Sequence, residues 1–165
     1  MALAKFHREK VKVAVLEDDA VCRELLVRLL GAMGAEVGAW SNGTEGLWAV
    51  FTDAAKPDLV VSDLHMEGID GLAVLGALKG SIDPKIQGIP VVLFTAAADK
   101  DVVERAKRGG AACTLGKPFN PSSLSEVLSA LVKKHDEQND PKDRPLVSSD
   151  MRIPTASALP RILPR

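Results

Sequence analysis

Short runs of branched apolar residues alternate with longer segments of helical periodicity over the first 134 residues of the chain. Runs of this length, bounded by polar or turn-forming residues, are typical of β-strands. Three of them are almost continuously apolar, as expected for parallel strands that are covered on both faces. We expect five strands, at residues 11–16, 36–40, 58–62, 90–94 and 111–115.

Amphipathic helices are expected after each of these strands. Their apolar residues recur at helical spacing within residues 22–33, 44–53, 72–79, 99–108 and 120–132. Asp99 and Asn120 are placed to cap two of these helices at their N-termini, and Gly34 is placed to end the first.

Five alternations of strand and helix predict a doubly wound α/β fold, because right-handed crossovers place helices on both faces of a parallel sheet. We expect a flavodoxin-like (βα)5 domain whose five parallel strands lie in the order 2-1-3-4-5. This domain is expected at residues 11–134, after an N-terminal extension at residues 1–10.

The character of the chain changes at residue 135, because half of its ten prolines fall between there and residue 165. Residues 135–165 are therefore predicted to be a flexible tail. Two interpretations of the tail remain open. It is either a linker or a segment that recruits a partner, the latter through "IPTASALPRILPR" at its end.

Composition narrows the class of partner. A formal net charge of −1 and a pI of about 6.3 provide no overall basic surface, so we do not expect direct nucleic-acid binding. No apolar run approaches the roughly 20 residues needed to span a bilayer, so we expect no membrane insertion. Cys22 and Cys113 lie within apolar patterns and are expected to be reduced core residues. These features favour a cytoplasmic protein.

Polar residues follow the predicted strands at the edge where open α/β sheets bind their ligands. They are Glu17, Asp18 and Asp19 after the first strand, Asp63 after the third, Thr95 after the fourth and Lys117 after the fifth. Clustered carboxylates repel one another unless a cation neutralises them, and Asp18, Asp19 and Asp63 would suit Mg²⁺. With Lys117 and Thr95 nearby, such a site could stabilise a phosphoryl group.

Taken singly, these residues have simpler interpretations. Asp18 and Asp19 could cap a helix, and Asp63 could begin a turn. Lys117 and Thr95 could be an ordinary loop residue and an ordinary strand end. Their coincidence at one sheet edge favours a functional site.

Four segments carry a resemblance to a known family: "LEDD" at 16–19, "VVSDLHMEGIDG" at 60–71, "VVLFTAA" at 91–97 and "GKPF" at 116–119. In this order and spacing they resemble the signature segments of the response-regulator receiver domain of two-component signalling, over about residues 11–134. The resemblance implies a signalling domain that catalyses only its own phosphorylation and dephosphorylation.

The resemblance also implies a function for each site residue. Asp63 would accept a phosphoryl group from a sensor histidine kinase, a phosphotransfer protein or a small phosphodonor. Asp19 would bind Mg²⁺ directly and Asp18 through water, and the main-chain carbonyl of His65 would complete the metal site.

Thr95 and Lys117 would receive the phosphoryl oxygens, and a cis peptide bond would join Lys117 to Pro118. The signal would pass to a downstream protein that the sequence does not identify.

Three residues depart from the family pattern. Glu67 stands where proline is usual, Gly116 where a branched residue is usual, and Thr114 where the family carries Tyr or Phe. That aromatic residue moves together with the hydroxyl corresponding to Thr95 when the domain switches. Thr114 therefore predicts weaker or different coupling to the face formed by the last strand and the helices beside it.

Two other functions remain alternatives. The chain could be a receiver that no longer switches and acts as a constitutive docking module. It could also be a magnesium phosphohydrolase, but that class needs an acid two positions after its nucleophile, and His65 occupies this position.

Overall fold

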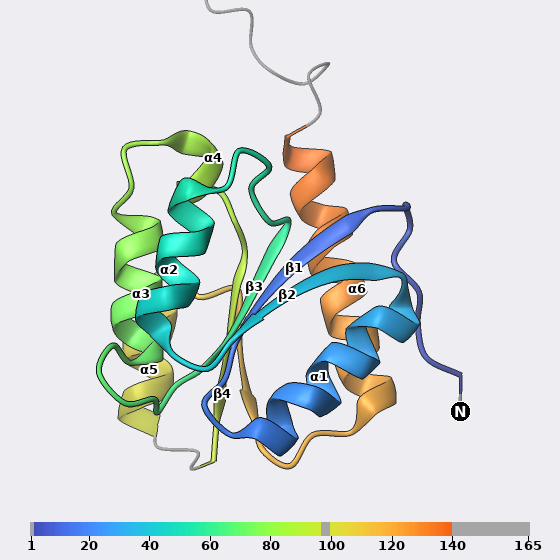
Figure 1. The fold of residues 1–165 in the computed structure, drawn as a ribbon, viewed down its shortest axis with the longest axis horizontal. Coiled ribbons are helices and arrows are strands. Elements are labelled where there is room, and N and C mark those ends of the chain that lie inside the picture. The colour runs from blue at the N-terminus through green and yellow to red at the C-terminus, as the bar shows by residue number, and fades with distance from the viewer. Residues whose placement is uncertain (1, 97–99, 140–165) are drawn as a thin grey trace, which may run out of the picture.

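The computed structural model describes residues 2–96 and 100–139 of the chain. Five parallel strands form one sheet in the order β2-β1-β3-β4-β5, which confirms the predicted fold class and strand order (Figure 1). The strands are β1 (Val11–Leu16), β2 (Ala35–Trp40), β3 (Leu59–Asp63), β4 (Val91–Thr95) and β5 (Cys113–Gly116).

In the described part of the chain, six helices connect and cover the strands. They are α1 (Ala20–Met33), α2 (Gly43–Thr52), α3 (Gly71–Lys79), α4 (Pro84–Gln87), α5 (Lys100–Arg108) and α6 (Pro121–Gln138). The sequence pattern does not predict α4, because a helix of four residues is too short to show periodicity. Asn120 caps α6 as expected, whereas Asp99, the expected cap of α5, lies outside the described residues.

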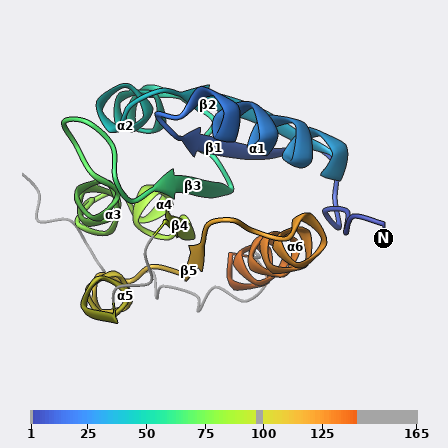
Figure 2. The same cartoon turned by 90° about the horizontal axis from the view of Figure 1, so that it is seen from below.

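Alternating side chains of the strands divide the core into two layers. One layer joins α1 and α6 to Val13, Val15, Val61, Val92 and Phe94. The other joins α2, α3, α4 and α5 to Ala14, Leu16, Val60, Val91 and Leu93. Figure 2 shows the two groups of helices on opposite faces of the sheet. Strands buried on both faces explain the continuous apolar runs in the sequence.

The N-terminal segment packs against the domain. Phe6 is buried in the core layer between α1 and α6, and its backbone N–H donates to the carbonyl of Met33 at 3.1 Å. The N–H of Ala4 donates to Ser125 Oγ at 2.9 Å. Residues that the sequence suggests are an extension therefore cover part of the hydrophobic core.

A cluster of charged groups ties this segment to the amino-terminal edge of the sheet. Arg8 contacts Asp58 and Asp136, each at 2.6 Å, and Asp58 also accepts a hydrogen bond from the backbone N–H of Lys12 at 2.8 Å. Burial would raise the pKa of Asp136, but the hydrogen bond and charge of Arg8 outweigh this effect and lower the pKa.

Helix α6 continues past residue 134, where the sequence pattern places the start of the tail, and ends at Gln138. Asp136, in its last turn, belongs to the charged cluster around Arg8. The remainder of the predicted tail, residues 140–165, lies outside the described residues. No helix in the described part of the chain is long and apolar enough to cross a membrane.

Replacing Phe6 tests whether the N-terminal segment is part of the folded unit. Phe6→Ala removes a buried aromatic side chain, so we expect the free energy of unfolding to fall by about 3 kcal/mol. Urea unfolding followed by circular dichroism measures this loss. Glu9→Ala, at an exposed position of the same segment, is the matched control, and equal stability of the two variants would contradict the prediction.

Candidate functional site

Three carboxylates meet at the carboxyl-terminal edge of the sheet. Glu17 and Asp18 follow β1, and Asp63 is the last residue of β3. One carboxylate oxygen of each lies within 4.8 Å of the others. Strand register produces this cluster, because Leu16 pairs with Ser62 and brings the ends of β1 and β3 level with each other. The acids are adjacent in space although more than forty residues separate them in the sequence.

Glu17 is fully buried in this cluster, whereas the sequence placed it at this edge of the sheet without a role as a metal ligand. Its Oε2 accepts from Lys117 Nζ at 2.7 Å, and its backbone N–H donates to the carbonyl of Trp40 at 3.1 Å. A carboxylate rarely occupies a fully buried position unless it is paired. The sequence signal for Glu17 was its position directly after the last apolar residue of the strand.

Asp19 lies outside the three-carboxylate cluster and caps α1 instead. Its Oδ1 accepts from the backbone N–H of Cys22 at 2.7 Å, and its backbone is extended, as an N-cap residue requires. The simpler interpretation of Asp19 as a helix cap is therefore the one that the structure shows. Within the acidic run, Glu17 and Asp18 therefore belong to the carboxylate cluster and Asp19 does not.

Asp63 is held at the end of β3 by its neighbours. Its Oδ1 accepts from the backbone N–H of Leu64 at 2.9 Å and lies 3.1 Å from Lys117 Nζ. The side chain is about 10% exposed, so most of it is shielded from solvent. Gly71 lets α3 approach closely, because a Cβ at this position would lie 2.4 Å from the Asp63 carbonyl oxygen.

Lys117 joins the first, third and fifth strands through its ammonium group. Burial lowers the pKa of Lys117, but the hydrogen bonds and charges of Glu17 and Asp63 outweigh burial and raise it overall. Its backbone N–H donates to the carbonyl of Thr95 at 2.8 Å. The peptide bond between Lys117 and Pro118 is cis.

The other predicted site residues occupy the same edge of the sheet. Thr95 is the buried last residue of β4 and pairs in register with Gly116 of β5. His65 is exposed in the loop that follows β3. Thr114 is half-buried within β5, two strands away from Asp63.

The thiol of Cys22 borders the cluster. Burial and the adjacent Glu17 raise its pKa to about 11, so the thiol stays protonated at neutral pH. Cys22 and Cys113 are both free and half-buried.

The charges of the site do not balance. Three carboxylates carry −3 and the Lys117 ammonium carries +1, which leaves −2 when all four groups are ionised. Hard carboxylate oxygens in this number suit a hard divalent cation. Asp18 is exposed, whereas Glu17 and Asp63 are buried, so the cluster opens to solvent beside Asp18.

Comparison with known sequences identifies the family. Residues 13–129 match the response regulator receiver domain. The transcriptional regulator NtrC of Klebsiella pneumoniae is 31% identical over 134 residues, which cover 81% of this chain and 27% of NtrC. The response regulator MtrA of Mycobacterium tuberculosis is 31% identical over 127 residues, which cover 77% of this chain and 53% of MtrA. The chain thus spans between about a quarter and a half of the length of these relatives.

Solved structures show the same fold. The chemotaxis protein CheY4 of Vibrio cholerae superposes with a TM-score of 0.67 at 25% identity, over 74% of this chain and 98% of that chain. A receiver domain from Clostridium thermocellum superposes with a TM-score of 0.70 at 26% identity, and the match covers 78% of this chain and 98% of that domain. The chain belongs to the response regulator receiver family, the receiver domains of two-component signal transduction.

Replacing Lys117 tests the electrostatic description of the site. Lys117→Met leaves Glu17 buried without its cation, so we expect the free energy of unfolding to fall by about 3 kcal/mol at pH 7. Because the pKa of Lys117 is raised above 10.5, its stabilising contribution is complete below that pH and is lost as pH rises through the folded-state value.

Urea unfolding between pH 7 and pH 11 measures both effects. The native chain should lose stability above pH 10.5 more steeply than the Lys117→Met variant. Lys107→Met, at an exposed position of α5, serves as the control and should keep the native pH profile. Parallel pH profiles for the native chain and Lys117→Met would contradict the assignment.

Proposed function

We propose that this receiver accepts a phosphoryl group on Asp63 from a phosphohistidine of a sensor histidine kinase or of a phosphotransfer protein. The observation that carries the proposal is the position of the Asp63 carboxylate, which lies 3.1 Å from Lys117 and within the cluster of Glu17 and Asp18. The partner would be cytoplasmic.

The transfer is a substitution at phosphorus. An oxygen of Asp63 forms the new bond to phosphorus, and the bond from phosphorus to the imidazole nitrogen of the donor breaks, with its electron pair remaining on that nitrogen. Lys117 Nζ is within reach of Asp63 Oδ1 and supplies a positive charge to the phosphoryl oxygens. The hydroxyl of Thr95 supplies a hydrogen-bond donor at the same edge.

Glu17, Asp18 and Asp63, with the main-chain carbonyl of His65, are the groups that would hold Mg²⁺. Their donor set fits, because it consists of hard oxygen ligands, and together with the Lys117 ammonium the three carboxylates leave a charge of −2 that one divalent cation balances. When bound, Mg²⁺ would neutralise negative charge on the phosphoryl oxygens. Asp19 is not in this ligand set, since its carboxylate caps α1.

Substitutions in the acidic run separate metal ligands from the helix cap. Asp18→Asn and Glu17→Gln each remove a negative charge from the cluster, so Mg²⁺ affinity should fall by about tenfold or more. Asp19→Asn keeps a capping oxygen and should leave Mg²⁺ affinity unchanged. Isothermal titration with Mg²⁺ measures all three, and a loss in Asp19→Asn equal to that in Asp18→Asn would contradict this ligand set.

Phosphorylation itself can be followed by intact mass after incubation with acetyl phosphate and Mg²⁺. We expect the native chain to gain one phosphoryl group, and we expect no gain for Asp63→Asn or after removal of the metal. Glu67→Gln, an acid in the same loop, is the matched control and should be phosphorylated. A folded native chain that gained nothing from acetyl phosphate or from a panel of kinases would instead favour a constitutive docking module.

Thr114 determines how far the phosphoryl signal spreads. Its side chain is too small to fill the space that an aromatic residue takes up when a receiver switches, so we propose weak coupling to β5 and a stronger response in the segment after Thr95. Amide exchange with and without beryllofluoride, a phosphoryl mimic, tests this. Protection changes that extend fully across Thr114 and α5 would disprove it.

A further inference from the structure

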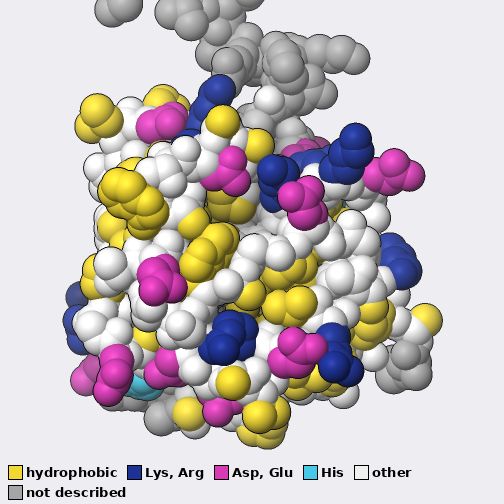
Figure 3. All heavy atoms as spheres, viewed as in Figure 1, with side chains coloured by type: hydrophobic (Ala, Val, Ile, Leu, Met, Phe, Trp, Pro, Cys, Tyr) yellow, Lys and Arg dark blue, Asp and Glu magenta, His cyan; other side chains and the backbone are white. Residues whose placement is uncertain are grey.

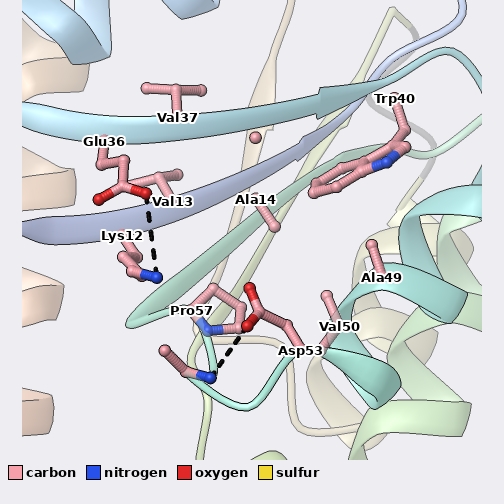
Figure 4. Close-up of a pocket in the computed structure, with 12 residues that line it drawn as sticks. Lys12, Val13, Ala14, Glu36, Val37, Trp40, Ala49, Val50, Asp53 and Pro57 are labelled. Atoms are coloured by element: carbon pink, nitrogen blue, oxygen red, sulfur yellow. Dashed lines mark hydrogen bonds and ion pairs between the residues drawn. The ribbon is translucent and has the colours of Figure 1, made fainter.

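A hollow of about 230 Å³ lies between the edge strand β2 and α2, on the opposite side of β1 from the core layer of α1 and α6. Its wall includes Lys12, Ala14, Gly38, Trp40, Ala49 and Val50. Figure 4 shows Ala49 and Val50 pointing from α2 toward Ala14 and Trp40 of the sheet. We call this feature the β2–α2 hollow.

Strand register explains why the hollow exists. On this face of β1 and β2, Lys12 pairs with Glu36, Ala14 with Gly38, and Leu16 with Trp40. The central pair has almost no side-chain volume of its own. The indole of Trp40 lies over Gly38, where an added Cβ would be 2.5 Å from the ring. The volume exceeds the roughly 150 Å³ of an apolar cavity that is sufficient to hold benzene.

The rim of the hollow exposes large aromatic side chains. Trp48, on α2, is 72% exposed, and Trp40 and Trp48 line an adjoining depression. Figure 3 shows hydrophobic side chains gathered on this face of the molecule. Contiguous exposed apolar surface of this kind marks a binding site more often than a solvated face. Trp40 and Trp48 are also the two tryptophans of the chain.

Acidic groups surround these aromatic side chains. Glu36, Glu45 and Asp53 are exposed around the hollow, and Lys12 is the cation that lines it. Lys12 is engaged by Glu36 at 3.9 Å. A ligand suited to this rim combines apolar side chains with positive charge.

One segment of the chain itself has this chemistry. Residues 151–165, "MRIPTASALPRILPR", contain three arginines and no acidic residue, together with Ile153, Leu159, Ile162 and Leu163. Proline-containing segments of this kind are bound by aromatic-lined grooves. The segment lies outside the described residues.

The end of the described chain is connected to the wall of the hollow by a series of contacts. Asp136, in the last turn of α6, is joined through Arg8 to Asp58, which accepts a hydrogen bond from the backbone of Lys12. Lys12 and Pro57, the neighbour of Asp58, both line the hollow. Gln138, the last residue of α6, lies beside Pro90 and Ala112, which precede β4 and β5. Residues 140–150 precede the segment and can span up to about 36 Å.

We propose that residues 151–165 dock in the β2–α2 hollow of the same chain, with Ile162 and Leu163 entering it and the arginines meeting the acidic rim. The hollow adjoins the functional site, because the carbonyl of Trp40 accepts a hydrogen bond from the backbone of Glu17. This contact concerns the chain's own tail and is independent of the proposed phosphorylation.

The test compares full-length chains. Ile162→Asp with Leu163→Asp should make residues 35–52 exchange their amide hydrogens several-fold faster than in the native chain and should shift tryptophan emission to longer wavelength. Ser148→Asp with Ser149→Asp makes the same charge change outside the segment and should behave as the native chain does. Ala49→Glu, in the wall of the hollow, should abolish the difference between native and Asp-substituted tails.

Additional measurements identify the segment that occupies the β2–α2 hollow. A synthetic peptide of residues 151–165, added to the Ile162→Asp, Leu163→Asp chain, should restore slow exchange, and a scrambled peptide should not. Equal exchange and emission in the native and substituted chains would overturn the proposal. So would protection that rises with protein concentration, which would assign the hollow to a second copy, or equal restoration by both peptides.

Discussion

The ammonium group of Lys117 is the interaction on which the functional edge of this domain depends. It lies 2.7 Å from Glu17 and 3.1 Å from Asp63, and so connects residues that follow or end three different strands. Burial disfavours its charge, but the two carboxylates raise its pKa overall, so the group remains a cation at neutral pH. Without it, Glu17 would be a buried and unpaired anion, which is among the most destabilising arrangements in a protein.

The same pairing leaves the site ready for a ligand. One ammonium cannot neutralise three carboxylates, so the edge keeps a net negative charge, which suits the divalent cation that we propose there. The sheet holds these groups in fixed positions, because Asp63 ends a fully buried strand and Gly71 allows α3 to pack against it. The contacts that stabilise the carboxyl-terminal edge are therefore the same contacts that position the groups of the proposed site.

Small residues in neighbouring strands shape the side of the sheet that α2 covers. Ala14 and Gly38 lie side by side in register and both line the hollow, and the indole of Trp40 lies over Gly38. The absence of side-chain volume is visible in the sequence only as two unremarkable small residues. It becomes a surface feature because β1 and β2 pair in the register that places them together.

Hydrophobic patterning in the sequence by itself predicted the class of fold, since continuous apolar runs between amphipathic segments are typical of a covered parallel sheet, and the structure confirms this class and the expected strand order. It also placed Asp63, Thr95 and Lys117 at strand ends, because burial stops where these polar residues begin.

Only the tertiary structure decided between the acids of "EDD". Glu17 turns inward to Lys117, which is one hundred residues away, while Asp19 caps α1. Local pattern cannot distinguish adjacent carboxylates whose environments are set by partners distant in the chain. The same reason applies to Phe6, whose burial depends on α1 and α6 meeting over it.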